Sequence, residues 1–149
     1  MLNNIKYSQI KDLKAFCEDL TSQPDWRFVF ESIACYEQDF EVDNVRFIDA
    51  DSIDEIQQEE LGGDEYILGC FNADFLSAIL NLSVEVIESI QKAEGFEALG
   101  KMIIEMDKLE ELQKEYVRFD GYGHHFNYYD FGEEELEFAG NTYHVFDNR

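Results

Sequence analysis

The sequence is poor in the residues that mark secreted and membrane proteins. It has one proline and three cysteines, and Cys17, Cys35 and Cys70 form no CxxC pair. An odd number of widely spaced cysteines is typical of buried free thiols in a reducing compartment. No apolar run approaches the roughly 18 residues of a membrane helix, and residues 1–14 lack the apolar core of a signal peptide. We therefore expect a cytoplasmic protein.

The sequence also has few basic residues relative to acidic ones. The chain has 34 Asp and Glu against 11 Lys and Arg, a formal net charge of −23. Such a surface repels nucleic acid and anionic membranes, so we expect it to bind neither directly. It attracts basic protein surfaces and metal cations. A high net charge also aids solubility, which is an alternative explanation for the composition.

The amount of charge is comparable with that of DNA. B-DNA carries one phosphate charge per about 1.7 Å of its axis, so 23 charges correspond to about 40 Å of duplex. A compact domain of this length has a radius of gyration of about 15 Å and hence a diameter of roughly 40 Å. A DNA-binding channel could not easily reject such a domain on electrostatic grounds alone.

Apolar residues are abundant enough for a folded core. The chain is 45% hydrophobic and 15% aromatic, whereas a disordered acidic tail has few aromatic residues. A chain of this length buries roughly 68–70% of its unfolded surface. No repeat or linker divides the sequence. We predict a single acidic globular domain over residues 1–149, in which residues 117–149 could form a small β subdomain.

The fold class predicted from the sequence is α+β, mostly helical in the N-terminal and central parts, with a C-terminal antiparallel β-hairpin or meander. Apolar residues at helical spacing predict helices over 9–20, 52–61 and 66–82, the last as one helix or two. Ser8, Ser52 and Ser83 are the expected N-caps, and Glu55 completes a capping box with Ser52. A further helical pattern from residue 84 to 116, interrupted at Gly95, is one long helix or two helices end to end.

The strands are expected near the middle and at the end of the chain. Residues 45–48 fit a short strand flanked by Asn and Asp, whereas the apolar residues of 26–40 fit either a helical or a strand period. Residues 136–138 and 143–146 alternate across the turn at residues 139–141, which predicts a hairpin. Residues 126–129 are expected to add a third strand.

The acidic residues are unevenly placed, with one long acidic segment at residues 37–65 and shorter ones at residues 105–115 and 130–137. Residues 37–65 hold twelve acids and one base, Arg46. Glu55, Glu59 and Glu60 share one face of the expected helix, where like charges cost about 0.2–0.5 kcal/mol per pair. An ordinary solvated face is one interpretation, and a surface that mimics phosphates is the other. The candidate partner-binding residues are Glu37, Asp39, Glu41, Asp43, Asp49, Asp51, Asp54, Glu55, Glu59, Glu60, Asp64 and Glu65.

Two apparent metal sites do not satisfy the chemistry of metal ligation. A calcium loop starting at Asp49 would place Ile53 at a ligand position and Asp54 where glycine is required. His124 and His125 would point to opposite faces of a strand, so both cannot easily bind one ion together with His144; the other candidate ligands of that cluster are Asp120 and Asp130. No phosphate-binding or nucleophile motif is present. We therefore predict no cofactor, no metal and no catalytic residue.

The C-terminal segment resembles a known family. The run YVRFDGYGHHF at residues 116–126, followed by a short strand and the aromatic residues of 143–146, resembles the end of ArdA-type antirestriction proteins. Those proteins carry an aromatic-Gly-Arg-Asp-Leu run and a short hairpin, and here His124 and His125 replace Arg-Asp. The resemblance implies a phage- or plasmid-encoded DNA mimic that occupies the DNA groove of a type I restriction enzyme, often as a dimer.

The leading hypothesis is an acidic DNA-mimic inhibitor. Its expected partner is a basic nucleic-acid-binding protein, such as a restriction, CRISPR or other defence nuclease complex. The first alternative is a protein-binding inhibitor without mimicry, such as an RNA polymerase inhibitor or a toxin immunity protein, using apolar contacts at Phe28, Phe30 or residues 128–129. The second is a metal-dependent enzyme that uses the histidines.

Overall fold

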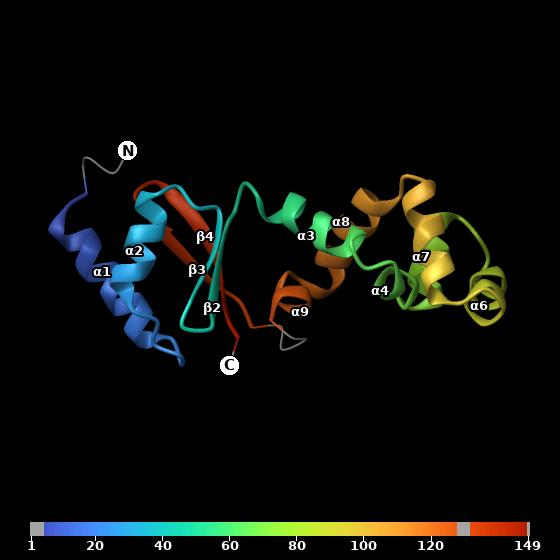
Figure 1. Ribbon diagram of the computed structural model, residues 1–149, viewed down its shortest axis with the longest axis horizontal. Helices are drawn as coiled ribbons and strands as arrows, with labels where there is room; N and C mark the ends of the chain where they lie inside the picture. The colour runs from blue at the N-terminus through green and yellow to red at the C-terminus, as the bar shows by residue number, and fades with distance from the viewer. Residues whose placement is uncertain (1–4, 128–131, 149) are drawn as a thin grey trace. The chain divides into compact units, whose positions relative to one another are not determined.

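The computed structural model describes residues 5–127 and 132–148. The chain forms two compact units. Unit 1 comprises Met1–Ile53 and Asp120–Arg149, and unit 2 comprises Asp54–Phe119. Each has a hydrophobic core of its own. Helices together with a four-stranded antiparallel sheet confirm the predicted α+β class (Figure 1).

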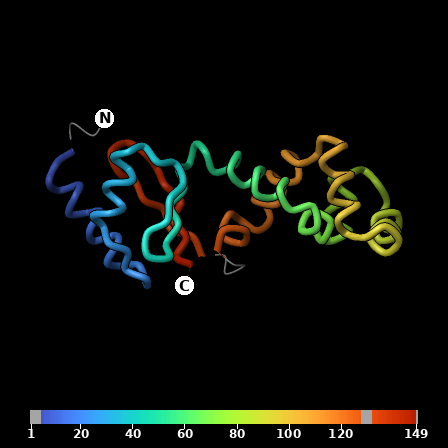
Figure 2. Tube along the Cα trace, viewed as in Figure 1, coloured from blue at the N-terminus to red at the C-terminus, as the bar shows by residue number. Residues whose placement is uncertain are grey.

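Unit 1 is a sheet built from the two ends of the chain. Its strands have the order β1-β2-β4-β3, and every neighbouring pair is antiparallel. Figure 2 shows the C-terminal strands, in red, beside the early strands, in cyan. The elements are α1 (Tyr7–Asp19), α2 (Trp26–Ala34), β1 (Asp39–Val42), β2 (Val45–Asp49), α9 (Gly123–Phe126), β3 (Glu134–Phe138) and β4 (Asn141–Asp147).

Alternation along the strands creates the core of unit 1. One face of the sheet packs against α1 and α2, and the fully buried Phe47 of β2 stacks on Phe40 of β1 at 5.0 Å between ring centroids. On the opposite face, Phe126 of α9 packs on Phe146 of β4 at 5.2 Å. The buried residues of the helix-facing side are Leu13, Cys17, Leu20, Val29, Ile33, Phe40, Val42, Val45, Phe47, Leu136, Phe138, Tyr143 and Val145.

Two tight turns fix the register of the hairpins. Asp43 and Asn44 join β1 to β2, and Ala139 and Gly140 join β3 to β4; all four have positive φ values, between 51° and 81°. Positive φ at both central residues defines the type I′ turn, whose twist matches that of the paired strands. The predicted C-terminal hairpin is confirmed, and its strands pair with β2, so they share a sheet with the N-terminal segment.

Several predicted boundaries differ in unit 1. The segment 26–40 contains both α2 and the start of β1, which explains why its apolar residues fit either period. Helix α1 begins at Tyr7 instead of after Ser8, and the backbone N–H of Lys6 donates to the Gln9 side chain at 2.8 Å. The predicted third strand is wrong at Phe126, which lies in α9; residues 128 and 129 lie outside the described residues.

Unit 2 is helical. Gly95, with a φ of 94°, interrupts the helical pattern that begins at residue 84, as predicted. Asp107, with a φ of 57°, breaks the pattern a second time, so the prediction of one or two helices is wrong and the segment forms α6, α7 and α8. Ser83 caps α6 as predicted, accepting a hydrogen bond from the N–H of Val86. The elements are α3 (Ile53–Gly62, of which all but the first residue belong to unit 2), α4 (Glu65–Gly69), α5 (Ala73–Leu80), α6 (Val84–Ala93), α7 (Phe96–Glu105) and α8 (Leu109–Asp120, of which all but the last residue belong to unit 2).

Two glycines let α4 and α7 approach closely. A methyl group on Gly100 of α7 would lie 1.8 Å from the carbonyl oxygen of Glu65, and one on Gly69 would lie 1.8 Å from that of Phe96. Both distances are far below van der Waals contact, so only glycine fits at either position. The core beside this contact contains Leu61, Leu68, Leu76, Ile79, Leu80, Ile87, Leu99, Ile103, Leu112 and Tyr116.

The three cysteines have different environments. All are free; Cys17 is buried, whereas Cys35 and Cys70 are exposed at the C-terminal ends of α2 and α4. The prediction of buried thiols is therefore wrong for two of the three. Burial, together with the nearby Asp25 and Glu18 carboxylates, raises the pKa of Cys17 to about 12.

Thiol titration should separate these environments. In native protein at pH 8 we expect two thiols to react rapidly with an aromatic disulfide reagent, and the third only in denaturant, because thiolate is the reactive form. The raised pKa also stabilises the fold below pH 9. That contribution should fall as the pH rises from 9 toward 12, because the unfolded state loses its thiol proton first. Three rapidly reacting thiols in the native protein would contradict this arrangement.

Candidate protein-binding surface

The twelve predicted acids are shared between the two units. Six of them, from Glu37 to Asp51, belong to unit 1, and the six from Asp54 to Glu65 belong to unit 2. The excess of acidic over basic residues is also divided nearly equally between the two units. In the sequence, unit 1 has 18 acids and 6 Lys or Arg, and unit 2 has 16 acids and 5 Lys or Arg. Each unit is therefore strongly negative by itself.

Helix α3 presents its carboxylates to solvent. Gln57 and Leu61 are buried, and Glu55 and Glu59, one turn apart, are exposed. Within the described residues, neither carboxylate accepts a hydrogen bond or forms an ion pair. The same is true of three predicted acids in unit 1, all of them exposed: Glu37, Glu41 and Asp51. These five carboxylates are available to cations from outside the chain.

Two predicted acids are held by bases of the chain itself. Asp39 binds Arg46 of the neighbouring strand through two hydrogen bonds of 2.8 and 2.9 Å. The Arg46 guanidinium also lies 4.9 Å from the centre of the Phe126 ring. Glu65 lies 3.9 Å from Lys101. A partner would have to displace these bases, so both carboxylates are weaker candidates.

Four further predicted acids have structural roles. The Asp64 carboxylate caps α4 by accepting from the N–H of Ile67 at 3.1 Å. The other three accept hydrogen bonds: Asp43 from the N–H of Asp25, Asp54 from the Gln113 amide, and Asp49, more weakly, from the Ser52 hydroxyl. Glu60, the last of the twelve, is exposed near the end of α3.

Acids also line both edges of the sheet. Asp39 and Glu41 alternate with buried residues on β1, and β3 carries exposed carboxylates at Glu134, Glu135 and Glu137. Charged side chains on edge strands prevent pairing with the edges of other molecules. Part of the predicted acidic surface therefore protects the sheet, a role that the sequence pattern did not reveal.

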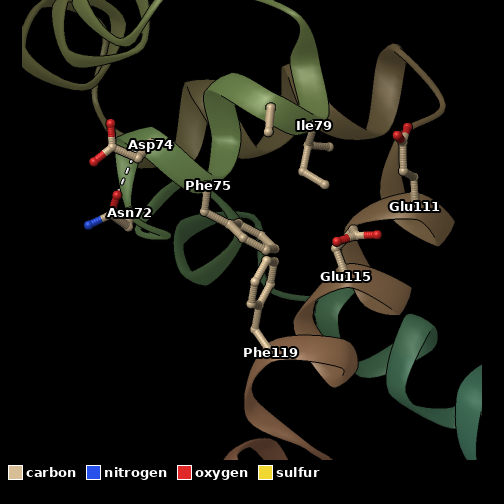
Figure 3. A pocket seen from close by; sticks show the side chains of 8 residues that line it. Asn72, Asp74, Phe75, Ile79, Glu111, Glu115 and Phe119 are labelled. Atoms are coloured by element: carbon tan, nitrogen blue, oxygen red, sulfur yellow. Dashed lines mark hydrogen bonds between the residues drawn. The ribbon is translucent and has the colours of Figure 1, made fainter.

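Unit 2 contains a groove that the sequence did not reveal. It has a volume of about 610 Å³ and lies between α5 and α8 (Figure 3). Phe75 and Phe119 point toward each other at one end of it, with their ring centroids 6.3 Å apart. The feature of the sequence that could have indicated it is the four-residue spacing of Glu111, Glu115 and Phe119, which places them on one face of a helix. The lining residues are Asn72, Asp74, Phe75, Ala78, Ile79, Glu111, Glu115 and Phe119.

The histidines lie on the face of the sheet that carries α9. The ring of His144 contacts the Glu133 carboxylate through Nδ1 and packs at 4.9 Å from the Tyr122 ring. His124 and His125 are in α9 and not on a strand. Within the described residues, no three His, Cys, Asp or Glu side chains are placed to hold a metal ion. Asp130, the remaining candidate ligand, lies outside those residues.

The aromatic contacts proposed for a non-mimic inhibitor differ in exposure. Phe28 on α2 is 59% exposed. Phe30 is partly buried and packs edge-on against Phe138 at 6.0 Å, so it belongs to the core of unit 1. Residues 128 and 129 lie outside the described part of the chain. Phe28 alone of the described candidates is therefore accessible.

Comparison with protein-family models, curated proteins and solved structures gave no match. The resemblance to ArdA-type proteins stays a prediction. None of the helices in the described ranges is both long enough and apolar enough to span a bilayer.

Proposed function

We propose that the chain is an acidic DNA mimic that acts in the cytoplasm and occupies the nucleic-acid-binding surface of a basic protein. The observation that supports this most is the set of exposed carboxylates that have no partner within the described residues, above all Glu55 and Glu59 on α3. A restriction, CRISPR or other defence nuclease complex is the expected target.

Charge-assisted hydrogen bonds would supply the specificity of such a complex. Arginine and lysine side chains that hold phosphates can also hold carboxylates, and these hydrogen bonds are roughly twice as strong as neutral ones. A large opposite charge also steers the partners together and raises the rate of association. Because each unit has an acidic excess of its own, both can contribute.

Competition with duplex DNA tests the proposal. The full chain would be used to isolate its partner from the host, and the purified complex would be titrated with a DNA duplex of about 20 base pairs. We expect DNA and the acidic chain to exclude each other. Affinity should also fall about tenfold or more between 50 and 200 mM salt, because screening weakens exposed charge pairs. A stable ternary complex with DNA would refute the mimicry.

A further inference from the structure

The groove of unit 2 has an apolar floor and an acidic rim. Helix α5 contributes Phe75, Ala78 and Ile79 to the floor, and Phe119 reaches it from α8. The carboxylates of Asp74, Glu111 and Glu115 stand around it, as Figure 3 shows. None of these acids is among the twelve predicted ones, so the inference stands apart from the proposed function.

Aromatic packing holds the floor in place. Phe119 is 65% exposed, yet its ring packs edge-on against Phe75. Phe75 stacks on Phe71 at 5.3 Å, and Phe71 meets the buried Tyr116 at 5.0 Å. The exposed ring is thus the outer end of an aromatic row anchored in the core. Positioned aromatic residues of this kind dominate the energetics of protein interfaces.

The rim selects for positive charge. Glu111 and Glu115 pair with Lys108 and Arg118 at 3.1 Å, and the Arg118 guanidinium also lies 5.0 Å from the centre of the Phe119 ring. Exposed contacts of this kind each contribute only about 0.2–1 kcal/mol. A cation from a partner can therefore replace them. No Lys, Arg or His within the described residues pairs with the Asp74 carboxylate. The same rim repels anionic ligands and a second copy of this chain, which carries a net charge of −23.

We infer that this groove binds a basic amphipathic helix of a partner protein. The lining residues of α8 run from position 111 to position 119, a length of about 12 Å at 1.5 Å per residue. Two helical turns span about 11 Å, so a docked helix can place apolar side chains at i, i+4 and i+7 on the floor. Its lysines or arginines, on either side of that stripe, then meet the three rim carboxylates.

A synthetic peptide can test the groove in the full-length protein. The probe is a fluorescein-labelled helical peptide of Leu and Lys, with Leu at i, i+3, i+4 and i+7. At 150 mM salt we expect saturable binding by fluorescence anisotropy, and at least tenfold weaker binding by a peptide of the same composition in scrambled order. A Leu–Glu peptide with the original spacing should not bind.

Groove variants locate the binding. Phe119→Ser should weaken it about tenfold, and Ala78→Trp, which fills the groove without opening the core, should do the same. Phe28→Ser, at a similarly exposed ring in unit 1, should leave it unchanged. Glu59→Lys should also leave it nearly unchanged, which separates this test from that of the proposed function. Equal binding of the ordered and scrambled peptides, or wild-type affinity in Ala78→Trp, would overturn the inference.

Discussion

A Gly100→Ala variant is expected to lose about 3 kcal/mol of stability in unit 2, the upper part of the usual range for overpacking. The added methyl group would lie 1.8 Å from the Glu65 carbonyl oxygen. Backbone cannot rotate aside as a flexible side chain can, so α4 and α7 must separate along their contact. Urea denaturation followed by circular dichroism at 222 nm measures the loss.

The chain provides a control and a second probe for this experiment. A methyl group on Gly63 would lie 3.4 Å from the nearest atom, an ordinary contact, so Gly63→Ala should change stability little. Trp26, the single tryptophan, packs against the core of unit 1. Its fluorescence should show whether the loss is confined to unit 2. Wild-type stability in Gly100→Ala would mean that α4 and α7 are not in close contact.

Glu59→Lys is expected to strengthen the fold while weakening the partner complex. The introduced lysine would follow Glu55 by one turn, the favourable orientation, and would stand near the C-terminal end of α3. These changes should raise the free energy of unfolding by about 0.5 kcal/mol. A charge-assisted hydrogen bond contributes roughly 1.5–3 kcal/mol, so binding should weaken at least tenfold.

Glu59→Lys is informative because its expected effects on fold stability and on partner affinity have opposite signs. Thermal denaturation measures the gain in stability, and titration of the purified partner measures the loss of affinity. Glu94→Lys, at an exposed acid at the end of α6 and outside the twelve, changes the net charge equally and should leave affinity nearly unchanged. Equal losses in both variants would mean that the partner senses only total charge. Glu55 is less suitable for reversal, because it lies in the first turn of α3, where the helix dipole favours an acid.

The sequence predicts helix boundaries better than it predicts which strands pair in the sheet. Ser83 and Gly95 mark the starts of α6 and α7, and the sequence shows both because capping and glycine conformation are local effects. The pairing of β2 with β4 joins residues about a hundred positions apart, and no local pattern encodes it. The segment 26–40 was ambiguous because Phe28, Phe30 and Ile33 fit either a helical or a strand period, and the segment contains both α2 and the start of β1.

The sequence predicts the candidate surface only in part, because the contacts of its side chains depend on tertiary structure. The acidic segment 37–65 is visible as composition, but composition does not show that Asp64 caps a helix or that Asp39 binds Arg46. The groove was missed because Phe75 fits a buried helix by its spacing. Whether Phe119 reaches it depends on how α5 and α8 pack, which is a tertiary property.

The arrangement of unit 1 in the chain has a consequence for synthesis. Strand β2 ends at Asp49, and β3 begins only at Glu134, after the whole of unit 2. At a ribosomal rate of about 5–20 residues per second, roughly 4 to 17 seconds pass between the two. During that time, the helical insert can fold on its own, while Phe47 and the apolar sides of α1 and α2 await the last hairpin. A nascent chain stalled before residue 134 should therefore expose apolar surface to chaperones through its first fifty residues.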